Sequence, residues 1–240
     1  VACIFCRSGY FYCCFRDKLF LHVHQLSHKP AMSNSQGTAN SITLKGSAKI
    51  IHDYMLYSVN SILFQRGIYP AGQFRPEEYN NVPVMVLQNR KVAPFITKTM
   101  EQVEKWIMEQ KVEKVTMMIY SLEKKEAIER WDFNIEAEYD DVSDATSDKL
   151  VSKIQAEIRA VMRQILSTIS FLPCIEQVCT FDLIIQMKDN ADVNEEQILY
   201  EFQRVNKDNI EVKDAHTMSL KIFSTGVNKV ETQVYYKVTQ

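Results

Sequence analysis

LKGSAKIIHDYMLYSVNSILFQRG, residues 44–67, sets the architecture of the chain. Its apolar residues recur at the three- and four-residue spacing of a helix, Ser41 or Thr43 can cap the start, and Gly67 follows the end. The second half has few polar positions, so a helix there must be covered on most sides. We therefore predict a helix that runs through the centre of the fold. Its inward positions are Leu44, Ala48, Ile51, Met55, Val59 and Ile62.

Two further helices and several strands follow. One helix is expected to start near Pro94, and another covers residues 148–170 and ends before Pro173. Residues 130–136 alternate, which predicts a strand with Trp131, Phe133 and Ile135 on its core face. Residues 84–87, 112–120 and 181–187 are also strand-like, and we expect Trp106 to be a core residue. These elements predict one α+β domain over residues 41–240.

The last fifty residues differ from the rest. Residues 188–196 and 206–215 are polar, and two alternating runs follow, around Met218 and around Val234. A mobile segment followed by a two-strand ribbon could form a flap. From the residues alone, an ordinary hairpin at a sheet edge is the favoured interpretation.

Residues 1–40 form a separate leader and polar tail, which we expect to be disordered or absent from the mature protein. Charged residues interrupt the apolar positions, which argues against a signal peptide. A zinc site is an alternative, because Cys3 and Cys6 are suitably spaced and His24 and His28 follow, although the spacer exceeds the usual length of about 12 residues. We favour a third interpretation, in which Met32 is the true start.

Composition restricts the function. The leader has a net charge of +3, whereas residues 41–240 contain 24 of the 28 basic and 29 of the 30 acidic residues, a net of −5. Such a domain lacks a basic face for nucleic acid, so we expect neither nucleic acid nor a membrane as a partner. Two cysteines in the domain, Cys174 and Cys179, suit a reducing compartment.

Catalytic and cofactor motifs are not evident either. The four glycines after Ser41 form no phosphate-binding loop, and His52 and His216 lie in no nucleophile or metal motif. We expect His52 to be at the surface or its boundary, and the domain to be a non-enzyme without metal or cofactor. An enzyme with a cryptic site, lined by these histidines or by clustered carboxylates, is the rival hypothesis.

One helix face is a candidate contact surface. Arg159 and Arg163 are four residues apart in the third helix, and Gln164 follows, so they share a face away from the apolar stripe. A solvated helix face is the simpler interpretation. A protein contact surface is the alternative, because arginine is enriched in interface hot spots.

Three motifs together resemble a known family. ITLKGSA (residues 42–48) leads to SILFQRGIYP (61–70), ERWDFNIE covers 129–136, and IRAVMRQI (158–165) is followed by FLP (171–173). This combination resembles the HORMA-domain mitotic arrest deficient proteins of the spindle-assembly checkpoint. The match runs from about Ile42 to Gln240 and is strongest up to Leu183. Residues 190–215 depart from the family pattern, and the chain stops slightly short of the expected belt end, which affects partner sequence preference.

The resemblance implies a fold and a mechanism. Three helices pack on one side of a mainly antiparallel sheet, and residues 188–240 form a mobile safety belt with open and closed positions. The closed belt wraps a short peptide that joins the sheet as a strand. The implied partners are a kinetochore coiled-coil receptor and the co-activator of the anaphase-promoting ubiquitin ligase, with delay of anaphase as the outcome. The implied location is the nucleus, the kinetochore in mitosis, and the cytoplasm.

The resemblance also assigns residues. Open and closed copies are expected to associate through Arg163 and Gln164, with Phe171 nearby and Arg159 on the same face. The belt and its bed are expected to include Phe181, Ile184, Phe223, Val234 and Tyr236. YNNVPV (residues 79–84) and VEKV (112–115) also resemble the HORMA subunit of a translesion DNA polymerase, which is the alternative function.

Overall fold

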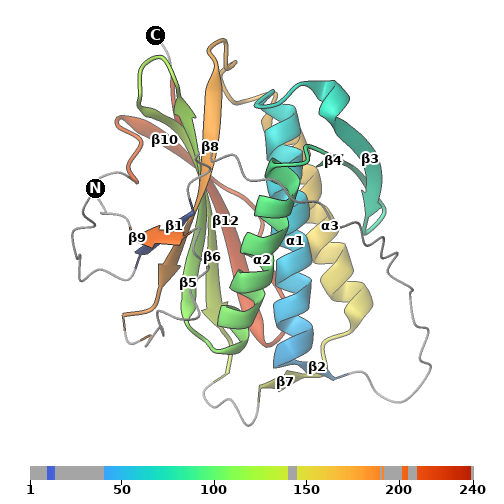
Figure 1. Cartoon of the computed structure of the whole chain (residues 1–240). Coiled ribbons are helices and arrows are strands. Elements are labelled where there is room, and N and C mark those ends of the chain that lie inside the picture. Colours follow the sequence, from blue (N-terminus) through green and yellow to red (C-terminus); the bar gives the residue numbers. More distant parts are fainter. Residues whose placement is uncertain are drawn as a thin grey trace.

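In the computed structural model, three helices pack on one face of a sheet (Figure 1). The structure describes residues 10–13, 41–139, 145–189, 191, 202–204 and 210–238. The helices are α1 (Leu44–Gln65), α2 (Val92–Met108) and α3 (Val151–Thr168). This arrangement confirms the predicted α+β class with its three helices on one side.

The main sheet is antiparallel throughout its recorded pairs. Its order is β10 (Ala215–Ser219), β12 (Asn228–Lys237), β6 (Ala127–Ala137), β5 (Val112–Ser121), β8 (Cys179–Met187), β1 (Tyr10–Cys13) and β9 (Phe202–Arg204), and β11 (Phe223–Ser224) also pairs with β12. Two small sheets join β2 (Ile42–Thr43) with β7 (Thr146–Ser147), and β3 (Phe74–Tyr79) with β4 (Val82–Leu87). A short 3-10 turn, η1 (Ala71–Gln73), precedes β3.

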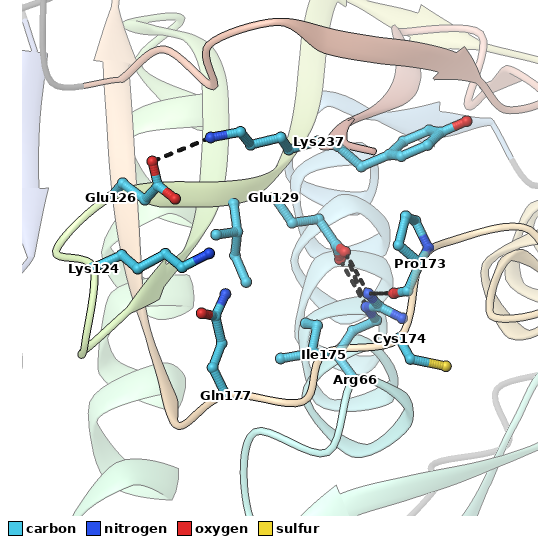
Figure 2. A pocket seen from close by; sticks show the side chains of 11 residues that line it. Arg66, Lys124, Glu126, Glu129, Pro173, Cys174, Ile175, Gln177 and Lys237 are labelled. Carbon is cyan, nitrogen blue, oxygen red and sulfur yellow. Dashed lines mark hydrogen bonds and ion pairs between the residues drawn. The ribbon is translucent and has the colours of Figure 1, made fainter. Parts of the chain in front are cut away.

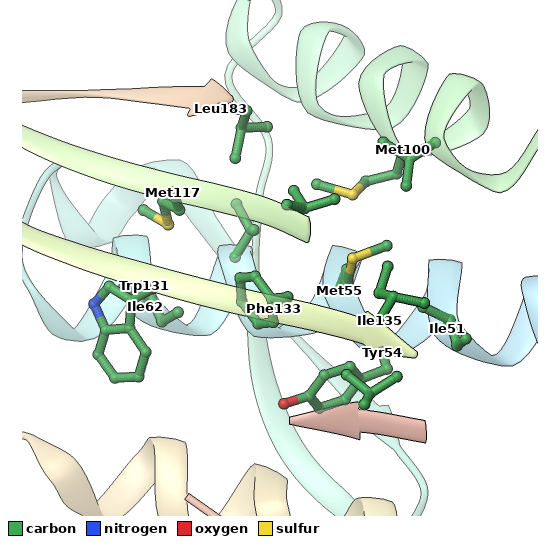
Figure 3. Packing of buried hydrophobic residues seen from close by; sticks show 14 of the residues in the cluster. Ile51, Tyr54, Met55, Ile62, Met100, Met117, Trp131, Phe133, Ile135 and Leu183 are labelled. Carbon is green, nitrogen blue, oxygen red and sulfur yellow. The ribbon is translucent and has the colours of Figure 1, made fainter. Parts of the chain in front are cut away.

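Helix α1 is the central element. Thr43 caps its start, because the Thr43 hydroxyl accepts a hydrogen bond from the Gly46 N–H at 3.2 Å. Gly67, with φ +65°, follows its end, where few other residues are tolerated. Met55 and Ile62 are fully buried against the sheet (Figure 3), as the sequence predicts. The predicted core side chains of β6 are buried as well: Trp131, Phe133 and Ile135.

The start of α2 agrees with the prediction of a helix that begins near Pro94. The helix begins at Val92, where the side-chain carbonyl of Asn89 accepts hydrogen bonds from the N–H groups of Lys91 (3.0 Å) and Val92 (3.2 Å). Pro94 therefore occupies the first turn, where its missing N–H costs little. Trp106 in this helix is fully buried, which confirms its predicted role in the core.

The C-terminal ribbon is part of the sheet. β12 pairs with β10 on one side and with β6 on the other, from Asn228 opposite Ala137 to Tyr236 opposite Glu129. The favoured interpretation, a strand pair at a sheet edge, is therefore confirmed, with β10 outermost. His52 corrects another expectation: it is only 5% exposed, and its Nδ1 lies 2.8 Å from Asp53 Oδ1, so it is buried.

Candidate functional site

At the β8 edge of the sheet, a strand from far away in the sequence lies between two others. β1 pairs antiparallel with β8, with Tyr12 opposite Ile184, and antiparallel with β9, with Tyr12 opposite Gln203 (Figure 1). An inner strand of this kind is held by main-chain hydrogen bonds on both sides. The position therefore accepts an extended segment of chain, which is the geometry of peptide recognition by strand addition.

The segment that follows β8 reaches both edges of the sheet. Its first described strand, β9, lies beyond β1 at the β8 edge, whereas β10 and β12 lie at the opposite edge, next to β6. We call residues 188–240 the belt, and residues 210–212 the belt crossing. Because the chain must pass from one edge to the other between β9 and β10, the belt extends across the sheet.

The belt crossing packs on the face of the sheet that the helices leave open. Ile210 and Val212 are 6% and 8% exposed and cluster with Met118 and Ile184. Met118 alternates with Met117, which belongs to the helix-side core. Since side chains alternate between the two faces of a strand, this second cluster lies opposite the helices. Ile184 therefore packs against the belt crossing, and its role in peptide capture stays a prediction.

The charged guanidinium of Arg130 holds the belt crossing through a hydrogen bond to its backbone. Its Nη1 donates to the Ile210 carbonyl at 3.1 Å, and its Nε donates to Asp132 Oδ1 at 2.8 Å. The guanidinium also lies 4.7 Å from the ring centroid of Tyr235. Burial alone would lower the pKa of Arg130, but the hydrogen bonds and charge of Asp132 outweigh it and raise this pKa. Arg130 thus stays charged while it links the sheet to the belt.

A second ionic cluster lies near the end of β12 (Figure 2). Arg66 Nη2 lies 2.9 Å from Glu129 Oε2, and both side chains are at most 5% exposed. Trp131 Nε1 donates to Glu129 at 2.7 Å, and Arg66 donates to the Pro173 carbonyl at 2.6 Å. Burial raises the pKa of Glu129, although Arg66 and Trp131 oppose this shift. The cluster joins the C-cap of α1, strand β6 and the segment after α3, beside the β12 residues Tyr236 and Lys237.

The other predicted belt residues lie on the helix side of the sheet. Phe181 faces the helices, where its ring centroid lies 6.1 Å from that of Phe95 on α2. Phe223 is 1% exposed, with its ring centroid 4.7 Å from that of Tyr54 on α1. Val234 is fully buried and Tyr236 is half-buried, and both lie on β12. The belt thus contacts both the helix-side core and the open face of the sheet.

The residues of the predicted association face differ in their exposure and in their hydrogen bonds. Arg163 is exposed, and Phe171 is 71% exposed. Arg159 instead donates to the Asn80 carbonyl in the β3–β4 turn at 3.0 Å. Gln164 accepts a hydrogen bond from the Lys221 N–H of the belt at 2.6 Å. Arg163 and Phe171 are therefore accessible to a partner, and Gln164 connects this face to the belt. We keep the association role itself as a prediction.

The described ranges contain neither a candidate metal site nor a candidate membrane-spanning helix. In them, no group of three or more His, Cys, Asp or Glu side chains is arranged to hold a metal ion. None of the helices in those ranges is long and apolar enough to cross a membrane. The alternative zinc ligands Cys3, Cys6, His24 and His28 lie outside the described residues. Leader residues 10–13 form β1, and whether the leader belongs to the mature protein stays a prediction.

This combination of a three-helix layer, an antiparallel sheet and a belt spanning it defines a class of peptide-binding domains. The chain belongs to the HORMA domain family, whose pattern it matches over residues 47–228. It is similar to the mitotic spindle checkpoint component mad2 of Schizosaccharomyces pombe, with 34% identity over 198 residues, 82% of this chain and 94% of that protein. It is also similar to the human mitotic spindle assembly checkpoint protein MAD2A, with 33% identity over 86% of this chain and 96% of that protein.

Solved structures agree with this assignment. A chain in the crystal structure of the mitotic checkpoint complex matches with a TM-score of 0.69 and 34% identity, covering 80% of this chain and 99% of that one. HTP-2 of C. elegans, bound to the HIM-3 closure motif, matches with a TM-score of 0.68 over 82% of this chain and 92% of that one. Its 11% identity shows the shared fold alone. The resemblance to mitotic arrest deficient checkpoint proteins is thus confirmed.

Proposed function

We propose that this protein is a spindle-assembly-checkpoint adaptor that captures short peptides of partner proteins. The observation that carries the proposal is the inner-strand position between β8 and β9, with the belt extending from it to the opposite edge of the sheet. The relatives named for the mitotic spindle checkpoint support the same role. Capture of this kind requires binding and no chemical step, so the protein acts without catalysis.

The proposed partners are a kinetochore coiled-coil receptor and the co-activator of the anaphase-promoting complex. Binding the co-activator would inhibit the ubiquitin ligase and delay anaphase. The belt switches between an open and a closed position, and a peptide favours the closed one because it binds only there. The arrangement with β12 beside β6 and the crossing at Ile210 corresponds to the closed position in this proposal.

The proposal includes self-association and a location. Open and closed copies would associate through Arg163 and Phe171, with Gln164 transmitting the position of the belt through its bond to Lys221. The protein would act in the nucleus and at kinetochores in mitosis, and also in the cytoplasm. The checkpoint names of the two relatives at 34% and 33% identity favour this role over that of a translesion polymerase subunit.

Peptide binding tests the proposal. The protein beginning at Met32 would be titrated calorimetrically with overlapping peptides of the co-activator, and separately with peptides of the polymerase catalytic subunit, all from the source organism. We expect one co-activator peptide to bind and its proline-substituted copy to fail, because proline cannot donate within a strand. Binding of polymerase peptides alone would refute the checkpoint assignment. Hydrogen exchange of β8 would locate the bound peptide.

A further inference from the structure

The inner-strand position is filled by the chain's own N-terminal segment. Residues 10–13 form β1, whose backbone pairs with residues 183–186 of β8 and with residues 202–204 of β9. This strand comes from the leader, and the domain begins only after residue 40. The segment therefore occupies the place that the proposed function assigns to a partner peptide.

Pairing on both sides makes this occupancy exclusive. An antiparallel inner strand uses its N–H and C=O groups alternately toward each neighbour. A second strand cannot form the same hydrogen bonds with β8 while β1 is present. A partner peptide that adds to this edge must first displace residues 10–13.

Two features of the chain favour occupancy by the attached segment. Residues 14–40 connect β1 to β2 and α1, so the segment is always near its site, and tethering of this kind corresponds to an effective concentration of about 1 mM. The leader carries a net charge of +3, and residues 41–240 carry a net of −5. Opposite charges favour the association of the two parts.

We propose that residues 10–13 are a built-in competitor that occupies the peptide site and weakens the binding of partner peptides. This inference rests on the proposed function for the identity of the competing ligand. A chain that starts at Met32 lacks β1 and has the site open. The affinity of the full chain for a partner peptide equals the affinity of the open site multiplied by the fraction of molecules in which the site is free. A site that is free in one molecule in ten therefore gives about a tenfold weaker affinity.

The test uses the full chain, the chain beginning at Met32, and a full chain carrying Phe11→Pro and Tyr12→Pro. Phe11 and Tyr12 are adjacent in an inner strand, so their N–H groups point to different neighbours, and the two prolines weaken both pairings. Gln25→Pro, outside the strand, is the matched control. The probe is a fluorescent peptide copying residues 8–16, with serine replacing Cys13 and Cys14, measured by anisotropy.

We expect the probe to bind the shortened chain and the double-proline variant. Its affinity for the full chain and for the Gln25→Pro variant should be lower by a factor of about ten or more. A probe that binds none of the four, or all four equally, would overturn the inference. The double-proline variant keeps residues 1–40, so a folding defect caused by shortening the chain cannot hide the result.

A second measurement separates this inference from the proposed function. Unlabelled co-activator peptide is added to the shortened chain with the probe bound. Displacement supports both ideas, whereas simultaneous binding of both peptides would overturn the competitor role. If the co-activator peptide binds but the probe does not, the inference fails and the proposed function stands. If only the probe binds, self-occupancy stands and the proposed partner is wrong.

Discussion

Replacing Arg130 with alanine should release the belt crossing. The variant loses the hydrogen bond from the guanidinium to the Ile210 carbonyl at 3.1 Å and the contact with the Tyr235 ring at 4.7 Å. A hydrogen bond from a charged group contributes about 1.5–3 kcal/mol, and an exposed cation–π contact about 0.5–1 kcal/mol. A net loss of about 2 kcal/mol corresponds to roughly thirtyfold in an equilibrium constant.

Hydrogen exchange and peptide release measure this effect. Amides of residues 210–212 should exchange about thirtyfold faster in the Arg130→Ala variant, and a captured peptide should dissociate faster by a similar factor. Arg130→Lys should be intermediate, because lysine keeps the charge beside Asp132 but lacks the planar fork. Arg90→Ala, which changes an exposed arginine, is the control and should match the unmodified protein.

Global unfolding in urea separates a local effect from a general one. Asp132, 1% exposed, also loses a partner in Arg130→Ala, but it keeps Thr116 Oγ1 at 2.7 Å and Lys114 Nζ at 3.3 Å. Some loss of global stability is therefore expected. A variant with reduced global stability but unchanged exchange at residues 210–212 would refute the role of Arg130 in holding the belt.

Three further predictions follow from other contacts. Arg163→Glu should abolish self-association and leave peptide affinity unchanged, and sedimentation of this variant as a stable dimer would contradict it. Glu129→Gln should lower the free energy of unfolding in urea by about 3–5 kcal/mol, because it leaves the buried Arg66 without its ionic partner, whereas Arg66→Met combined with Glu129→Leu should recover much of this loss. Burial raises the pKa of Tyr54, so stability is fully present below the unfolded-state pKa of about 10 and falls as pH rises above it. Tyr54→Phe should unfold about 1 kcal/mol more easily at neutral pH, since it loses the bond to Thr232 at 2.7 Å, and should lose stability less steeply above pH 10.

Local patterns predicted most of the fold. Helix α1 and strand β6 have single, consistent periodicities, so their buried positions could be read directly from the residues. Strand β3 escaped prediction because its sequence, FRPEEY, has one buried residue and includes a proline. What defines it is the pairing with β4 through a turn in which Asn80 and Asn81 both have positive φ, a combination suited to hairpin turns.

The belt contacts were harder to predict because they join residues distant in sequence. Arg130 and Ile210 lie 80 positions apart, and Gln164 and Lys221 lie 57 apart. One local signal was present in the sequence, the consecutive apolar residues Met117 and Met118 of β5. In the structure both are fully buried, so both faces of this strand are covered. Consecutive apolar residues in a strand indicate cover on both faces, and three helices on one side leave the second face to another segment.

The belt crossing and strand β12 are held with different strength. At the crossing, Ile210 and Val212 each gain about 1.5–3 kcal/mol from burial, and Arg130 adds one charged hydrogen bond, so releasing it costs on the order of 5–8 kcal/mol.

Detaching β12 would expose Val227, Val230 and Val234, break its ladder with β6, and separate Thr232 from Tyr54. Asn228, which also donates to Ser47 of α1 at 2.8 Å, would lose that buried partner. The crossing therefore opens at lower free energy than β12, so the peptide capture that we propose would allow a peptide to leave while the C-terminal strand stays in the sheet. Conversion between the two belt positions that we propose would require the second, more costly step.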